Sequence, residues 1–216
     1  MPGLAAHTDA IFDKVTTLKC IEPYWLVGGT ALSLQIHNRL SEDLDFMCWR
    51  TQKKQKLEVD WVSIEKEFSS IGTLSSKDIW DFNHVEFILD GVKISFYISD
   101  KYSPINNTID LKNKLKMADI ESIAAMKMEV MLRRSNFRDY YDIYSILKKG
   151  VDFMRVLELS LSYSGHALST KNLLAILTDS SRFKIDSGFL QLEPVYSVTP
   201  QQIELYLRDC IKKNLK

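Results

Sequence analysis

The sequence predicts an α+β fold, in which a small mixed or antiparallel sheet flanked by helices comes first and a helical part follows. Three observations support this class. A short apolar run meets a glycine pair and then a helical stretch within residues 24–35, and two alternating apolar runs flank an Asp-Gly turn at residues 90–91. After about residue 100 strand patterning stops and the spacing becomes helical. We therefore expect an α/β core over residues 1–105 and a helical subdomain over residues 106–216.

The first elements lead to the glycine pair. Residues 8–19 carry apolar side chains at three-and-four spacing, which predicts an amphipathic helix. Residues 24–27 form a short apolar run typical of a strand. Residues 30–35 are expected to form a helix with Thr30 as its N-cap. The order strand, glycine turn, helix follows.

The remaining elements of the first half alternate between strand and helix. Residues 43–49 resume a strand, and residues 59–71 predict a helix. Residues 84–89 and 92–98 alternate apolar and polar side chains around Asp90-Gly91, which is a strong hairpin signal. A two-residue turn there places Leu89 opposite Val92 and Glu86 opposite Ser95.

The second half reads as a series of helices. Five windows show helical spacing, at residues 119–134, 139–148, 153–162, 168–178 and 200–213. The aromatic side chains around the second window are expected in the core rather than at a base-stacking surface: Phe137, Tyr140, Tyr141 and Tyr144.

Composition limits the partners and the compartment. The 28 basic and 28 acidic side chains cancel, so a polyanion would have to be held by local patches. The three cysteines show no zinc or redox spacing. No stretch approaches the ~20 apolar residues that span a bilayer, and the N-terminus lacks a leader pattern. We therefore expect a cytoplasmic protein without a membrane partner.

Gly28 and Gly29 lie between a predicted strand and a predicted helix. A glycine pair at this place lets the backbone approach a ligand closely, and the helix N-terminus offers free N–H groups and positive dipole charge to a phosphate. The alternative is a tight turn that needs positive φ and has no further role.

Asp43 and Asp45 lie two residues apart on a predicted strand, so both carboxylates project from one side. Magnesium prefers hard oxygen ligands and is commonly held by one or two carboxylates together with substrate phosphates. The pair therefore suits metal-assisted phosphoryl transfer. The alternative is a solvated strand face that carries two acids.

Two separated motifs resemble those of the AbiEii/AbiGii-type nucleotidyltransferase toxins, a branch of the polymerase-β-like superfamily. The first is Leu26-Val-Gly-Gly-Thr-Ala-Leu32 followed by Arg39-x-Ser41-x-Asp43-Leu-Asp45-Phe46. The second is Lys127-Met128, then Arg134, Arg138-Asp139 and Asp142, with Lys127-Met128 where the family usually has Lys-Leu. The resemblance covers roughly residues 20–148 and implies a polymerase-β-like nucleotidyltransferase domain.

The sequence does not decide whether the second motif lies on one continuous helix or on two. A continuous helix would place Lys127, Arg134 and Arg138 on one face. A break at Ser135-Asn136 would instead bring Asp139 to Lys127 by tertiary contact. The alternative to both is a solvated stripe in which Arg138 pairs with the acid four residues later, worth a few tenths of a kcal/mol.

The resemblance also assigns roles. Asp43 and Asp45 would hold the metal, Lys127 would bind the triphosphate or help position the nucleophile, and Asp139 would orient the nucleophile or serve as a polar partner, so that these four are the expected catalytic residues. Arg39 and Ser41 would support the turn before the aspartates. The expected substrate-binding residues are Gly28, Gly29, Thr30, Arg39, Ser41, Arg134 and Arg138.

One position departs from the superfamily pattern. Polymerase-β-like transferases usually carry a third carboxylate on a neighbouring strand, and the resemblance places it at Ser95. A serine hydroxyl is a weak neutral ligand, so the metal-binding triad or its general base would be incomplete. Our hypothesis is that Glu86, opposite Ser95, supplies the missing carboxylate; the alternative is an exposed strand glutamate.

The leading interpretation is a magnesium-dependent enzyme that transfers a nucleoside monophosphate from a nucleoside triphosphate to an acceptor hydroxyl. The resemblance favours a tRNA 3′ end or a protein as acceptor and an antitoxin as partner, in a toxin–antitoxin or phage-defence system. The alternatives are a degenerate module that binds nucleotide or a partner protein without turnover, and a phosphodiester hydrolase. Two basic series could grip phosphate, although solvated loops are the commoner explanation: Lys53-Lys54-Gln55-Lys56, and Lys112, Lys114 and Lys116.

Overall fold

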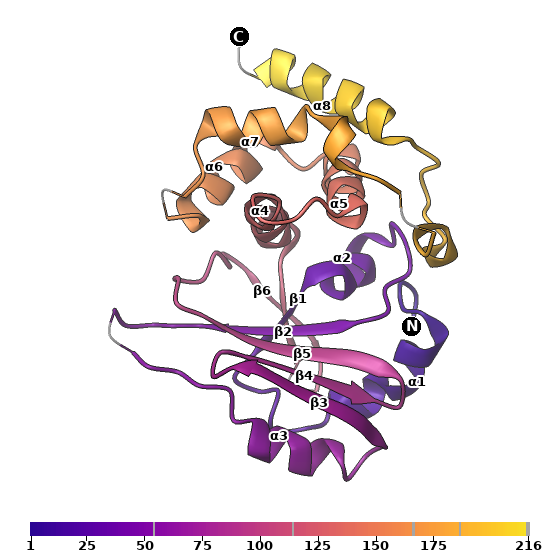
Figure 1. The fold of residues 1–216 in the computed structure, drawn as a ribbon, viewed down its shortest axis with the longest axis vertical. Coiled ribbons are helices and arrows are strands. Elements are labelled where there is room, and N and C mark those ends of the chain that lie inside the picture. The colour runs from indigo at the N-terminus through magenta and orange to yellow at the C-terminus, as the bar shows by residue number, and fades with distance from the viewer. Residues whose placement is uncertain (54, 114, 166, 186, 215–216) are drawn as a thin grey trace.

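A mixed seven-stranded sheet and a set of helices build the molecule, which confirms the α+β class (Figure 1). The computed structural model describes residues 1–53, 55–113, 115–165, 167–185 and 187–214. The strand order is β3-β4-β5-β2-β1-β7-β6. β1 pairs with β7 and β2 pairs with β5 in parallel, and the other neighbours are antiparallel.

The centre of the sheet forms where the sequence predicts it. α1 (Ala6–Val15) precedes β1 (Trp25–Val27), α2 (Gly28–Ile36) follows directly, and β2 (Leu44–Trp49) returns antiparallel to β1. Alternate residues of β2 point to opposite faces, and those that face the core are Leu44 and Phe46. The predicted helix over residues 59–71 appears as α3 (Trp61–Phe68).

The predicted hairpin is confirmed together with its register. β4 (His84–Leu89) and β5 (Val92–Ser99) pair so that Leu89 lies opposite Val92 and Glu86 opposite Ser95. The turn residues Asp90 and Gly91 both have positive φ, as a two-residue turn of this kind requires.

Three strands were not predicted. β3 (Leu74–Asp81) is an edge strand with mostly exposed side chains, so it lacks the apolar alternation that reveals a strand. β6 (Thr108–Lys112) and β7 (Leu115–Ala118) lie after residue 100, where strand patterning was expected to stop, and that expectation is wrong. β7 reaches the sheet by long-range parallel pairing with β1, which leaves no local signal.

The division into two domains stays a prediction, but the sheet places its boundary differently. Since β6 and β7 belong to the sheet, residues 106–118 are not part of a purely helical segment. We propose that the helical part begins after Ala118. Figure 1 shows its helices gathered at one end of the molecule, with the strands, α1 and α3 at the other.

The helical part contains the five predicted helices. They are α4 (Ile120–Val130), α5 (Phe137–Lys148), α6 (Phe153–Tyr163), α7 (Thr170–Leu177) and α8 (Pro200–Asn214), with short 3-10 turns η1 (Ser180–Arg182) and η2 (Phe189–Leu192) between α7 and α8. The aromatic residues of α5 lie in the core, as expected. Tyr140, for example, stacks on Phe183 with ring centroids 4.1 Å apart.

Aromatic packing fixes one face of the sheet against α3. Phe96 of β5 stacks on Phe46 of β2 at 5.2 Å, and Phe68 of α3 packs edge-on against Phe87 of β4 at 5.4 Å. All four side chains are fully buried. Because side chains alternate along a strand, the neighbours of these residues, including Asp45 and Ser95, point to the opposite face. That face carries the site.

Candidate nucleotidyltransferase site

The glycine pair and the second aspartate meet at the junction of β1 and α2. Val27, the last residue of β1, lies opposite Asp45 in the antiparallel ladder. Gly28 has a φ of +68°, and a Cβ atom added there would lie 2.5 Å from Oδ2 of Asp45. A Cβ atom added at Gly29 would lie 2.6 Å from Nη2 of Arg39. Both glycines are therefore needed for close approach, and the acid lies against the bend.

The N-terminus of α2 has no side-chain cap, so the prediction that Thr30 caps this helix is wrong. The helix starts two residues earlier, at Gly28, because β1 runs directly into it. Thr30 is fully buried, and its hydroxyl bonds to Oγ of Ser41 at 2.9 Å and donates to the carbonyl of Asp43. Thr30 and Ser41 therefore hold the turn before the aspartates, and the N–H groups of α2 stay open to a ligand.

The two aspartates differ in environment. Asp43 precedes β2, and its partly exposed carboxylate lies 3.4 Å from Nζ of Lys93. Burial and the neighbouring charge of Asp43 raise the pKa of Asp45 to about 6. The two acids thus repel one another at neutral pH, and a cation placed between them and a phosphate would relieve that repulsion.

Glu86 lies opposite Ser95, as predicted, and Ser95 lies between Glu86 and Asp45 in the sheet. Its carboxylate accepts hydrogen bonds from Ser95 at 3.3 Å and from Nε1 of Trp80 at 3.3 Å, and it lies 3.2 Å from Nε2 of His84. No three His, Cys, Asp or Glu side chains in the described parts of the chain gather closely enough to hold a metal ion. Among the described residues Glu86 therefore does not join Asp43 and Asp45 in such a group, and its carboxylate is held by Trp80, His84 and Ser95.

Across from the aspartates, α4 and α5 carry a buried charge cluster. Nζ of Lys127 lies 2.9 Å from Asp139 and 2.8 Å from Asp142. Arg39 makes two hydrogen bonds to Asp142, at 2.9 Å from Nε and 2.8 Å from Nη2. Asn38 donates to the same carboxylate at 2.8 Å. Except at Asn38 Oδ1, no unpaired buried polar atom is found in this cluster, so its charges are compensated.

The geometry of the second motif is now decided. α4 ends at Val130, and Asn136 caps α5 by accepting a hydrogen bond from the N–H of Arg138, so the break at Ser135-Asn136 is confirmed. Asp139 reaches Lys127 by tertiary contact and also accepts two hydrogen bonds from Arg134, the shorter at 2.8 Å.

The alternative pairing of Arg138 with Asp142 is wrong. Arg138 lies 3.4 Å from Glu42, whereas Asp142 points inward to Arg39 and Lys127. Burial alone would raise the pKa of Asp142, but the positive charges of Arg39 and Lys127 outweigh it and lower the pKa to about 2. Asp142 is therefore a buried structural anion, a role that the sequence did not reveal because its partner Arg39 is far away in the chain.

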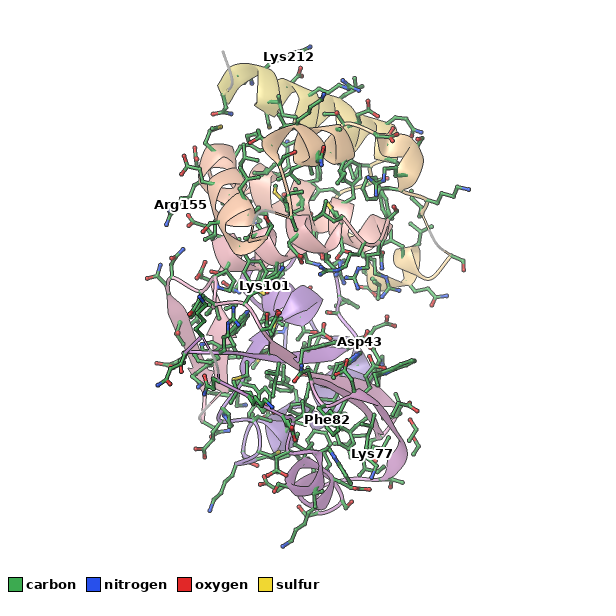
Figure 2. The ribbon with its side chains drawn as sticks, turned by 60° about the vertical axis from the view of Figure 1, so that its left-hand side comes forward. Asp43, Lys77, Phe82, Lys101, Arg155 and Lys212 are labelled. Carbon is green, nitrogen blue, oxygen red and sulfur yellow. The ribbon has the colours of Figure 1, made fainter. Side chains whose placement is uncertain are left out.

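A cleft of about 390 Å³ lies between the sheet and the helices, and it joins the two motifs. Gly28 and Asp45 line it from the side of the sheet, and Lys127 and Arg134 line it from the helical side. Lys101, just after β5, also lines it. Figure 2 shows Lys101 where the helical part meets the sheet, with Asp43 on the sheet side. A negatively charged, phosphate-bearing ligand suits this mixture of cations and free helix N–H groups.

The residues present fit a magnesium ion that shares its coordination with a ligand. Two carboxylates are available, and the lack of a Cβ atom at Gly28 lets one of them, Asp45, lie against the glycine bend. Magnesium is usually bound by one or two carboxylates together with substrate phosphates and water, so a third carboxylate is not needed for binding. Lys93, which the sequence did not single out, supplies an additional cation beside Asp43.

The described lysines of the two basic series do not line this cleft. Lys112 pairs with Asp13, and Nζ of Lys116 lies 4.0 Å from the ring centroid of Trp25. Lys53 and Lys56 are exposed. Lys54 and Lys114 lie outside the described residues.

A glycine bend at a helix N-terminus, Asp45 against it and cations across a cleft are the features expected of a nucleotidyltransferase-type site. Solved structures share the fold. JHP933 from Helicobacter pylori aligns with a TM-score of 0.55 over 97% of this chain and 92% of its own, at 20% identity. MenT4, a nucleotidyltransferase toxin from Mycobacterium tuberculosis H37Rv, aligns with a TM-score of 0.55 over 88% of this chain and 76% of its own, at 16% identity.

The chain belongs to the family of AbiEii nucleotidyl transferase toxins of Type IV toxin–antitoxin systems, whose model matches residues 19–197. This confirms the resemblance and the polymerase-β-like fold. An uncharacterised protein of Aquifex aeolicus (strain VF5) is 28% identical over 143 residues, and this match spans 63% of the chain and 64% of that relative. In the described part of the chain, no helix has the length and apolarity needed to cross a membrane.

Proposed function

We propose that the protein is a magnesium-dependent toxin that transfers a nucleoside monophosphate from a nucleoside triphosphate to an acceptor hydroxyl, on the 3′ end of tRNA or on a protein. The observation that carries this proposal is the contact of Asp45 with Gly28 at the open N-terminus of α2. It places an acid and a phosphate-binding bend within one ligand's reach. Family membership supports nucleotidyl transfer and, as a further proposal, control by an antitoxin.

The proposed reaction exchanges the phosphoanhydride bond between the α- and β-phosphates for a phosphoester bond to the acceptor. The acceptor oxygen forms a bond to the α-phosphorus while the bond from that phosphorus to the bridging oxygen breaks, and pyrophosphate and a proton leave. A magnesium ion bound by Asp43, Asp45 and the phosphates would neutralise the charge that develops in this step. Gly28 and Gly29 would present the N–H groups of α2 to the phosphates.

The buried cluster would orient the cations of the cleft. Ion pairs with Asp139 and Asp142 hold the ammonium group of Lys127, and Asp139 also holds the guanidinium group of Arg134. Both cations therefore line the cleft in fixed positions. Fixed cations stabilise developing charge without reorganising during the reaction. Arg39 lies 2.8 Å from Asp142 and is buried, so we assign it a supporting role rather than a contact with substrate.

The test is a transfer assay with each of the four labelled nucleoside triphosphates, a tRNA pool and a protein pool. We expect label to enter one acceptor in the presence of magnesium and to disappear with EDTA. Asp43→Asn should abolish transfer, since it removes one of the two acids, and it should remain folded because Asp43 is partly exposed. Transfer that persists in Asp43→Asn would exclude this site.

Ser95 favours a second candidate, a module that binds nucleotide without turnover. It replaces the usual third carboxylate and is fully buried beside Asp45 in the parallel ladder. In that case calorimetry would show magnesium-dependent binding of nucleotide while none of the acceptors gains label. Shortened rather than extended RNA would instead indicate phosphodiester hydrolysis.

A further inference from the structure

Three aromatic rings form a continuous stack along the open part of the sheet. Trp80 of β3 stacks on His84 of β4 with centroids 6.1 Å apart and an interplanar angle of 18°. His84 stacks in turn on Tyr97 of β5 at 4.2 Å and 26°. We call these three residues the ring ladder. Because His84 and Tyr97 are direct partners and Tyr97 lies two residues after Ser95, the ring ladder shares the sheet face of Asp45.

One end of the ring ladder, Tyr97, lies in the cleft, and the other end, Trp80, is exposed to solvent. Tyr97 lines the same cleft as Asp45 and Arg134. Trp80 is 66% exposed, which is unusual for a tryptophan. Hydrogen bonding fixes the rings, since Glu86 accepts from Nε1 of Trp80 at 3.3 Å and lies 3.2 Å from Nε2 of His84. A rigid, exposed aromatic surface thus leads into the cleft.

We propose that the ring ladder binds the unpaired bases of a single-stranded RNA acceptor and leads its 3′ end to Asp45. This proposal rests on the proposed function and names the acceptor class. Flat aromatic surfaces bind single-stranded nucleic acid by stacking, with little dependence on sequence. The edges of the rings are already engaged by Glu86, whereas the outer face of Trp80 is open.

The strand order places the acceptor, rather than the nucleoside triphosphate, on the ring ladder. The phosphates would dock at α2, beside β1, while the ring ladder lies on β5, β4 and β3, on the other side of β2 and its Asp45. In an in-line transfer, the attacking and leaving oxygens lie on opposite sides of the phosphorus. Since pyrophosphate would leave toward α2, the attacking hydroxyl comes from the side of the ring ladder.

The experiment measures RNA binding and nucleotide binding separately in the full chain. The RNA probe is a short, fluorescein-labelled single strand with the sequence of a tRNA 3′ end, followed by fluorescence anisotropy; nucleoside triphosphate binding is followed by calorimetry. We expect Trp80→Ala to weaken RNA binding about 10-fold and to leave the nucleotide affinity unchanged. Trp80→Phe should restore most of the RNA affinity, because it keeps a stacking ring.

Phe82 provides the matched control. It lies two residues from Trp80, is 73% exposed, and makes no ring contact among the residues that the structure describes. Phe82→Ala should leave RNA binding unchanged. Equal losses in Phe82→Ala and Trp80→Ala would mean that general apolar exposure binds the RNA, and would overturn the proposal.

Two further outcomes would also overturn the proposal. If Trp80→Ala weakens nucleotide binding and spares RNA binding, the ring ladder holds the base of the nucleotide. If it spares both but weakens capture of a purified protein partner, β3 is a protein-docking edge. The binding assay does not require turnover, so a ring ladder that binds RNA in a protein without transfer activity would refute the proposed function alone.

Discussion

Gly28 and Asp45 are in contact, and only glycine permits that contact. Replacing Gly28 with alanine would add a Cβ atom 2.5 Å from Oδ2 of Asp45, at a φ of +68°. We expect Gly28→Ala to displace the carboxylate and to lower the transfer rate about 100-fold. The backbone strain should also cost about 1 kcal/mol of stability, which chemical denaturation would measure.

Gly91→Ala is a control that separates the effect of backbone strain from the effect of displacing the Asp45 carboxylate. Gly91 also has positive φ, at +82°, but an added Cβ atom there meets nothing within 4 Å. This variant should lose about the same stability as Gly28→Ala while keeping the wild-type transfer rate. An equal loss of transfer in both variants would show that stability, rather than the contact with Asp45, limits activity.

At the residue scale, local motifs were predictable and distant partners were not. Gly28, Gly29, Asp43 and Asp45 were identified because spacing along one strand and one turn fixes their directions. Glu86 was correctly placed opposite Ser95, since hairpin register follows from the turn. Its hydrogen bond to Trp80 was not foreseen, because β3 was not recognised as a strand.

The N-terminus of α5 is the element on which the charge cluster depends. Asn136 caps this helix, and Asp139 lies in its first turn. We expect Asn136→Ala to lower the free energy of unfolding by about 1 kcal/mol, because the cap hydrogen bond is lost. The transfer rate should fall as well, since a frayed first turn no longer fixes Asp139 against Lys127 and Arg134.

Ser169→Ala is the control for this prediction. Ser169 caps α7 by accepting a hydrogen bond from Asn172, and no charged residue of the cleft lies on that helix. Its loss should cost similar stability without changing transfer. A full transfer rate in Asn136→Ala would show that Asp139 is held by its ion pairs alone.

Helices and strands whose apolar side chains recur at regular spacing were predictable from the sequence, and those without such spacing were not. α4 to α8 appear at the predicted windows, with ends that differ by a few residues, because apolar side chains recur at helical spacing in each. The edge strands β3 and β6 carry exposed, polar side chains, so no apolar alternation distinguishes them from loops. Thr30 was misassigned as a cap since residue preference favours threonine there, whereas the direct run of β1 into α2 moves the helix start to Gly28.

At the scale of the whole molecule, Asp142 connects the sheet half to the helical half. It is fully buried and pairs with Arg39 after α2 and with Lys127 of α4. We expect Asp142→Asn to cost about 3–5 kcal/mol at pH 7, because two buried cations lose their counter-charge. Urea unfolding of both proteins at several pH values would measure this difference.

The pH dependence follows from the lowered pKa of Asp142. Its folded pKa of about 2 lies below the ordinary value of about 3.9, so its contribution is complete above about pH 4 and is lost as pH falls through 2. The difference between wild type and Asp142→Asn should therefore shrink over that interval. Asp13→Asn is the control, because Asp13 is 72% exposed in its pair with Lys112 and should change stability by less than about 1 kcal/mol. A pH-independent difference would contradict this assignment.

The sequence by itself determined the α+β class, the hairpin and its register, the glycine bend, the aspartate pair and the five late helices. These features depend on side-chain period and turn chemistry, which act over a few residues. Only the tertiary structure decided the pairing of Arg39 with Asp142, the strands β6 and β7, the ring ladder and the hydrogen bond of Glu86 with Trp80. Each of these depends on contacts between segments far apart in the chain, whose choice is set by packing of the whole fold and leaves no local pattern.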